Sequence, residues 1–461
     1  MTEALRRKGR WSVLAAVGLG SFLTALDTSA VNAILPTIRG KFGADFEQAQ
    51  WVITIYLLGL TGLQLSFGRL GDARGHRTIF SLGFVVFVLS SVACALSQSL
   101  AQLIGARALQ AVGGAMISAN APALLTQHFP ARERGRVLGL QASMVYLGLT
   151  LGPSLGGWLA DAWDWHGIFW INAPLCAAAL VIIWTVIPAD PGRELQEPFD
   201  LLGAALFLTG MVAFMIALNR GPDWGWGSPL TLGILCAAAA LGVVFYRLES
   251  RLAAPMLDLR LFHSWEFSSA TLCALANYIA IYAVVYLTPH TLITLRGWST
   301  AEAGRLLTAQ PLMMALISPW AGNWSDRVGT RLPSTLGLLI MSAGLLVLAF
   351  QSASTSWVYL AFGLGLAGLG TGLFTSPNNS ALLGAAPRDR QGIASALLAT
   401  ARNGGMVLGV GLAGAVVSTA EGAGANEYHA VGWAFAVAAF VGVLGALLAA
   451  RRVEERAVED A

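Results

Sequence analysis

The chain has 461 residues, of which 56% are apolar and only 11% are charged. An average soluble domain has roughly 45–50% apolar and about 25% charged residues, so this chain has too few charges to cover a soluble surface and is predicted to be an integral membrane protein. The 28 Lys and Arg residues nearly balance the 25 Asp and Glu residues and form no long block, which argues against a disordered chain and against nucleic-acid binding.

Apolar runs separated by short loops follow one another along the whole chain, and they predict an all-α fold with fourteen transmembrane helices. Each run is close to the roughly 20 residues that a helix needs to cross a bilayer. The first run is too long for a signal peptide and contains Asp27, so we expect an uncleaved span. The expected spans are 12–35, 50–67, 78–97, 101–125, 136–159, 167–187, 200–218, 229–249, 266–288, 300–320, 333–352, 357–384, 393–418 and 430–450.

Basic residues are distributed unequally between the loops of the two sides. If the N-terminus is cytoplasmic, the basic loops 69–77 and 132–136 face the cytoplasm. The opposite side then holds only Arg39, Lys41, Arg220 and Arg296. Because cytoplasmic loops carry an excess of Lys and Arg, both termini are expected in the cytoplasm.

Two segments of the first half return in the second half at nearly the same offset. GRLGDARGHR (Gly68–Arg77) matches GNWSDRVGTR (Gly322–Arg331), and PARERG (Pro130–Gly135) matches PRDRQG (Pro387–Gly392). Such repeats indicate duplication of a six-helix unit. We therefore expect two pseudo-symmetric six-helix bundles, with a substrate path at their interface. The expected divisions are 1–190 for the first bundle, 191–261 for a linker with two additional transmembrane helices, and 262–461 for the second bundle and a short cytoplasmic tail.

The loop GRLGDARGHR resembles the signature between spans two and three of the major facilitator superfamily, and the resemblance extends over essentially the whole chain. Gly68, Asp72, Gly75 and Arg77 match the signature, and Asp326 is the repeat of Asp72. Glycines permit a sharp turn and close helix packing, while Asp72 can pair with a nearby Arg or cap a helix N-terminus. The resemblance implies a gate that is latched in one conformation; a plain basic loop is the alternative.

The first span contains LDTSAVNAILP, which is similar to the first-span motif of the fourteen-helix drug:proton antiporter branch of this superfamily. Asp27, Asn32 and Pro36 match, and Ser29 stands where that motif has Thr. A carboxylate inside a membrane is costly unless it is paired or exchanges a proton. The resemblance therefore implies that Asp27 is the proton site; a structural hydrogen bond is the alternative.

Two arginines within the spans also fit this resemblance. Arg107 matches the fourth-span Arg of the superfamily and projects, like Asp27, into the outer half of the membrane, where the two can pair. Arg402, in TARNGGMVLGVG, resembles the Arg-x-Gly-Gly segment of the thirteenth span, which implies a contact with substrate or gate. A fixed structural role is the alternative for each.

The fifth span contains GLTLGPSLGG, with Gly148, Gly152, Pro153, Gly156 and Gly157. Small residues every four positions make a flat face for close helix approach, and a proline permits bending. The segment resembles the motif associated with antiporters rather than symporters of the superfamily. It is the main reason to expect export.

Other polar residues in the spans are candidates for the substrate path, although such residues are also typical of helix–helix contacts. The candidates are Asn32, Gln64, Asn120, Gln141, Asn277, Gln310, Asn378 and Arg402; Asn172 and Asn379 are further polar residues. The sequence contains no phosphate-binding loop, HExxH motif or Ser/His/Asp arrangement, so neither an enzyme nor a cofactor or metal is expected.

The sequence as a whole predicts a proton-driven antiporter that exports small amphipathic compounds, such as antibiotics, dyes or toxic metabolites. Its partners would be protons, these compounds and the lipid bilayer, without nucleic acid. We expect a monomer in a bacterial inner membrane, driven by the proton gradient. The alternatives are a symporter or metabolite transporter of the same fold and, from another class, a transport-dead membrane sensor.

Overall fold

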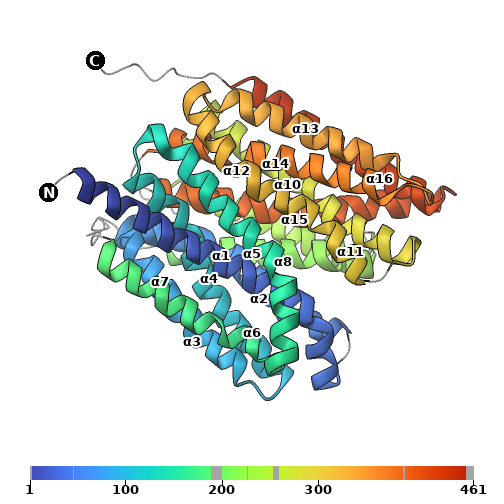
Figure 1. The fold of residues 1–461 in the computed structure, drawn as a ribbon, viewed down its shortest axis with the longest axis horizontal. Helices are drawn as coiled ribbons and strands as arrows, with labels where there is room; N and C mark the ends of the chain where they lie inside the picture. The colour runs from blue at the N-terminus through green and yellow to red at the C-terminus, as the bar shows by residue number, and fades with distance from the viewer. Residues whose placement is uncertain are drawn as a thin grey trace.

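The computed structural model describes residues 3–44, 46–187, 200–225, 227–252, 259–298, 300–387 and 390–452. Over these ranges the chain is helical and contains no strand (Figure 1). The helices of the first half are α1 (Glu3–Phe42), α2 (Phe46–Arg74), α3 (His76–Ala95), α4 (Leu100–His128), α5 (Arg134–Trp163), α6 (Gly167–Trp170) and α7 (Asn172–Val186), with a 3-10 turn at Ala131–Glu133.

The second half has the same order of long helices. It comprises α10 (Trp265–Pro289), a π-helical turn (His290–Leu295), α11 (Thr300–Leu307), α12 (Ala309–Val328), α13 (Arg331–Ala349), α14 (Trp357–Ala385), α15 (Gln391–Gly422) and α16 (Glu427–Ala450). Between the halves in sequence lie α8 (Leu201–Trp224), α9 (Pro229–Glu249) and a 3-10 turn (Leu259–His263).

Helices cover all the predicted spans, and among the described residues eleven are long and apolar enough to cross a membrane. The helices α5, α8 and α12 are not among these eleven. The first turn of α5 and the last turn of α12 are charged, and the apolar part of α8 covers only Leu201–Ala217. The structure therefore supports a multi-pass helical membrane fold without fixing fourteen spans.

Two predicted spans each contain a local irregularity. In the sixth it lies at Ile171, between α6 and α7, and in the tenth at Thr308, between α11 and α12; both residues keep right-handed helical backbone angles. Pro174 and Pro311 each follow the irregularity by three residues. Because proline has no N–H to donate to the preceding turn, one helical hydrogen bond is missing at each of these points.

Equivalent glycines bring helices together in the two halves. Gly83 faces Gly113 where α3 crosses α4, and Gly337 faces Gly370 where α13 crosses α14. A Cβ atom on Gly113 would lie 2.6 Å from the backbone nitrogen of Phe87. Both crossings therefore depend on the absence of a side chain, as is common where membrane helices pack closely.

The helices α8 and α9 pack against each other, and α8 also contacts α2 and α15, which belong to different halves. Gly62 of α2 leaves room for the side chain of Leu208. Most side chains of α9 are exposed, so this helix lies at the edge of the molecule. The joining segments 188–199 and 253–258 lie outside the described residues, and the predicted division into 1–190, 191–261 and 262–461 stays a prediction.

We expect Gly113→Leu to lower stability by about 1–3 kcal/mol, because a side chain there would overpack the α3–α4 crossing. Gly105→Leu is the matched control on the same helix, since a Cβ there would meet no atom within 4 Å. Thermal unfolding of the purified protein in detergent measures both. Equal midpoints for the two variants would contradict the proposed role of the crossing.

Candidate functional site

Asp27 of α1 and Arg107 of α4 form a buried ion pair in the first half. The Nη1 atom of Arg107 lies 2.6 Å from Oδ2 of Asp27, and each residue is 1% exposed. The Nε atom of Arg107 donates to the Val52 carbonyl at 3.2 Å, and its guanidinium lies 4.1 Å from the centre of the Tyr56 ring. The structure thus brings together the two charges that the sequence placed in the outer half of the membrane.

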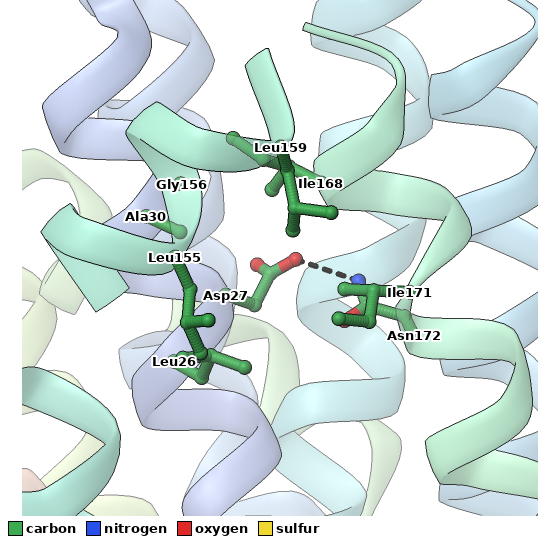
Figure 2. Close-up of a pocket in the computed structure, with 9 residues that line it drawn as sticks. All are labelled: Leu26, Asp27, Ala30, Leu155, Gly156, Leu159, Ile168, Ile171 and Asn172. Atoms are coloured by element: carbon green, nitrogen blue, oxygen red, sulfur yellow. Dashed lines mark hydrogen bonds between the residues drawn. The ribbon is translucent and has the colours of Figure 1, made fainter. Parts of the chain in front are cut away.

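Amide donors complete the surroundings of the carboxylate (Figure 2 shows the bond from Asn172). Oδ1 of Asp27 accepts from Nε2 of Gln110 at 3.1 Å and from Nδ2 of Asn172 at 2.9 Å. Both amides also donate to Oγ of Ser91, at 2.7 and 3.1 Å. Since Arg107, Gln110 and Asn172 all donate to Asp27, this arrangement fits an ionised carboxylate.

Sequence reasoning did not place Asn172 or Ser91 at this site. Gln110 could have been found, because it lies one turn after Arg107 on α4. Asn172 and Ser91 belong to α7 and α3, and nothing in the sequence fixes which side of these helices faces α1. Their assignment depends on the packing of the folded bundle.

At one end of the molecule, each repeated loop caps a helix of the other half. Asp72 accepts from the amides of Gly392–Ile393, at 2.8 and 3.1 Å, where α15 begins. Asp326 accepts from the amides of Gly135–Arg136, at 2.7 and 2.9 Å, where α5 begins. The first amides of a helix lack partners within the helix and carry partial positive charge, so a carboxylate stabilises them. Of the two roles open to Asp72, the structure shows helix capping.

Glycines allow the close approach of the two halves at the capped end. A Cβ atom on Gly135 would lie 2.6 Å from the carbonyl oxygen of Gly322, and Gly68 lies equally close to Gly392 in the symmetric contact. Gly75 has a φ of 92°, a left-handed conformation that favours glycine, and it separates α2 from α3. Arg77 donates to the Trp184 carbonyl at 3.3 Å and does not join the cap.

His76 joins Asp72 to α4 and was missed by the sequence reasoning. Its Nε2 atom lies 3.2 Å from Oδ1 of Asp72, and its Nδ1 atom lies 2.7 Å from Oδ1 of Asn120. Nδ2 of Asn120 donates to the carbonyls of Phe67 and Met116, so its Oδ1 atom accepts and His76 donates. Asn120, a candidate for the substrate path, is therefore linked through His76 to the capping residue Asp72.

Three glycines of the fifth span lie directly on α1. A Cβ atom on Gly148 would be 2.6 Å from the Phe22 carbonyl oxygen, Gly156 faces Ala30, and Gly152 faces Ser29. The expected close approach is observed here. The other two residues of the motif do not share in it: Pro153 is exposed within a continuous helix, and a Cβ on Gly157 would meet no atom within 4 Å.

The remaining candidates for the substrate path fall into different places. Gln64 accepts from Nδ2 of Asn403 across the two halves at 3.4 Å, whereas Gln141 donates to Ser21 within the first half at 3.1 Å. Asn378 accepts from Arg452 at 2.5 Å and is buried inside the second half. Gln141 and Asn378 therefore serve as contacts between helices in this conformation.

Asn277 and Gln310 are buried, and Asn277 makes no hydrogen bond through its side chain within the described part of the chain. Asn32 is exposed on α1. Arg402 of α15 interacts with the hydroxyl of Tyr278 from α10, and Tyr146 of α5 also reaches this hydroxyl. These three residues come from both halves, so they form a polar group where the halves meet.

We expect Asp72→Asn and Asp326→Asn each to shift the protein about tenfold toward the conformation in which the capped end is open, and the double variant to shift it further. The amide loses the charge and one acceptor oxygen, so it caps the helix less well.

The reporter is Ala396→Cys at the Gly68 contact, with the four native cysteines replaced by Ala, and the measurement is its rate of reaction with a hydrophilic thiol reagent. Glu133→Gln is the control, since Glu133 precedes α5 but its side chain makes no capping hydrogen bond. An unchanged rate in both Asp variants would show that the caps do not hold this end closed.

Comparison with known proteins agrees with the fold. The model of the Major Facilitator Superfamily matches residues 17–257 and 270–460. The chain is 35% identical over 409 residues to the multidrug resistance protein Stp of Mycobacterium tuberculosis, covering 88% of this chain and 75% of that protein. It is 34% identical over 402 residues to the riboflavin transporter RibZ of Clostridioides difficile, covering 87% of each.

The solved structure of the proton:xylose symporter XylE has the same fold, with a TM-score of 0.66, 16% identity, and coverage of 96% of this chain and 95% of that one. The family model, the extent of the sequence relatives and the fold all agree. The chain is a membrane transporter that belongs to the Major Facilitator Superfamily.

Proposed function

We propose that this transporter is a proton-coupled antiporter that exports small amphipathic compounds. The observation that carries the proposal is the buried Asp27 carboxylate, which accepts from Arg107, Gln110 and Asn172. The similarity to a multidrug resistance protein supports a drug-like substrate class. The glycine face of α5, which resembles an antiporter motif, supports export.

Proton binding at Asp27 would disturb its surroundings. A protonated carboxyl carries a hydrogen that needs an acceptor, while Arg107, Gln110 and Asn172 all present donors. Protonation would therefore weaken the contacts that join α1 to α4 and α7. In our proposal, loss of these contacts favours the alternative conformation, in which Asp72 and Asp326 release their helices and the cytoplasmic end opens.

We further propose fourteen spans with both termini in the cytoplasm of a bacterium, a monomer in the inner membrane, and the proton gradient as the source of energy without a cofactor. One proton moving across about 100 mV releases roughly 2.3 kcal/mol, which supports roughly fiftyfold accumulation of a substrate. The group formed by Arg402, Tyr146 and Tyr278, together with Gln64, Asn277 and Gln310, would line the path between the halves.

We expect Asp27→Asn to abolish substrate-induced collapse of a pH gradient in everted membrane vesicles, because the amide cannot exchange a proton. A panel of dyes and antibiotics supplies the substrates, with Asp164→Asn as the matched control. Asp164 is exposed beyond the end of α5, where the Trp165 amide and Lys41 hold its pKa below the usual range. Collapse that persists in Asp27→Asn would contradict the proton site.

A symporter or metabolite transporter is the second candidate, and it is favoured by the similarity to a riboflavin transporter and by the fold shared with a proton:xylose symporter. Uptake of riboflavin or another metabolite that accelerates when the external medium is acidified would support this candidate over the antiporter.

A further inference from the structure

A positive charge without an acidic partner lies where the two halves meet. Arg402 of α15 interacts with the hydroxyl of Tyr278 from α10, and Tyr146 of α5 reaches the same hydroxyl. None of the ion pairs within the described part of the chain includes Arg402. A charge inside a membrane-spanning helix is costly unless it is paired. Arg402 therefore differs from Arg107, which has Asp27 beside it.

Three tyrosines follow one side of α10 next to this charge. Tyr278, Tyr282 and Tyr286 are spaced by four residues, so they lie one above the other along the helix. The row lies against α15: a Cβ atom on Gly405 would be 2.8 Å from Cβ of Tyr278, and one on Gly414 would be 3.9 Å from the hydroxyl oxygen of Tyr286. The tyrosine row thus runs along the contact between α10 and α15.

Packing between the halves loosens at the level of Arg402. Residues 391–399 of α15, which lie between the capped end and Arg402, are all buried. Arg402, Tyr278 and Tyr282 are half-buried, and Tyr286 is 45% exposed. Tyr282 also interacts electrostatically with Arg402. The charge and the first two tyrosines therefore present surface that a ligand can contact.

The chemistry of these side chains favours an anion. A guanidinium has five N–H donors in a planar fork, more than one phenol oxygen can accept, and this fork matches the two oxygens of a carboxylate. Tyrosine rings offer flat apolar faces against which another aromatic ring can pack. A cation would also suit the ring faces, but it would lie beside Arg402 and be repelled by it.

We propose that Arg402, Tyr278 and Tyr282 form a substrate site for aromatic compounds that bear a carboxylate. The carboxylate pairs with the guanidinium of Arg402, and the aromatic ring packs on the two tyrosines. Since Tyr146 of the first half reaches the same group, a bound substrate would contact both halves. This inference rests on the proposed substrate path between the halves, and it narrows the proposed amphipathic substrates to aromatic acids.

The test compares ligands that share one ring system and differ in charge: naphthoate, its neutral analogue naphthamide and the cation naphthylmethylammonium. Isothermal titration calorimetry with the purified protein in detergent at neutral pH measures their binding. Arg402→Met removes the charge, whereas Arg402→Lys keeps the charge without the planar fork. Arg305→Met is the matched control, because Arg305 of α11 is exposed.

We expect wild type and Arg305→Met to bind naphthoate at least about tenfold more tightly than naphthamide, and Arg402→Met to lose this preference. If Arg402→Met does not fold, Arg402→Lys serves instead, with weaker binding of naphthoate and unchanged binding of naphthamide. Tyr282→Leu should weaken binding of both ligands by a similar factor, about threefold to tenfold, since it removes a ring and no charge.

Four results would overturn the site for aromatic acids: equal binding of naphthoate and naphthamide by wild type, tighter binding of the cation, no binding of naphthoate at millimolar concentration, or a preference for naphthoate that survives in Arg402→Met. The assay contains no proton gradient, so these results leave the proton site at Asp27 untouched. Conversely, a pH-gradient collapse that persists in Asp27→Asn would overturn the proposed coupling and leave the acid site standing.

Discussion

The structure depends first on the charge of Asp27, which lies in an apolar bundle and needs an opposite charge beside it. Asp27 can remain ionised in the core of the first half because Arg107 lies 2.6 Å away and because Gln110 and Asn172 donate to its other oxygen. Removing one partner from such a buried pair typically costs about 3–5 kcal/mol. The polar contacts of α1 with α4 and α7 therefore depend on the ionisation state of one side chain, and the proposed proton coupling rests on this link.

A second constraint acts at the capped end of the molecule. Helices α5 and α15 begin there, and their first amides have no hydrogen-bond partner within the helix. A carboxylate from the opposite half accepts from these amides in each case. Because the caps join the halves and not residues within one half, the proposed movement of one half against the other would break them. The repeat explains why there are two of them: Asp72 and Asp326 occupy equivalent positions, and so do Gly135 and Gly392. Rocking about the centre would break both caps together.

The sequence predicted the helical membrane fold, the family and the Asp27–Arg107 pair well, because these depend on apolar length, on repeated motifs and on charges that cannot stay unpaired in a membrane. It could not predict the irregularities at Ile171 and Thr308 from hydropathy, since a proline within an apolar run leaves the average nearly unchanged. Polar residues were harder still. Asn120 and Asn172 look alike in sequence, yet one binds His76 beside the capping Asp72 and the other binds Asp27. Only the rotation of each helix in the folded bundle separates these roles.

The central claim is that the ionisation state of Asp27 controls the capped end of the molecule. The most direct measurement is the distance between spin labels at Arg132 and Arg331, exposed residues at that end in opposite halves, as a function of pH. The account predicts a longer distance at low pH in the wild-type background, as protonation of Asp27 releases both caps, and a distance independent of pH in Asp27→Asn. The same pH dependence in Asp27→Asn as in the wild-type background would contradict it.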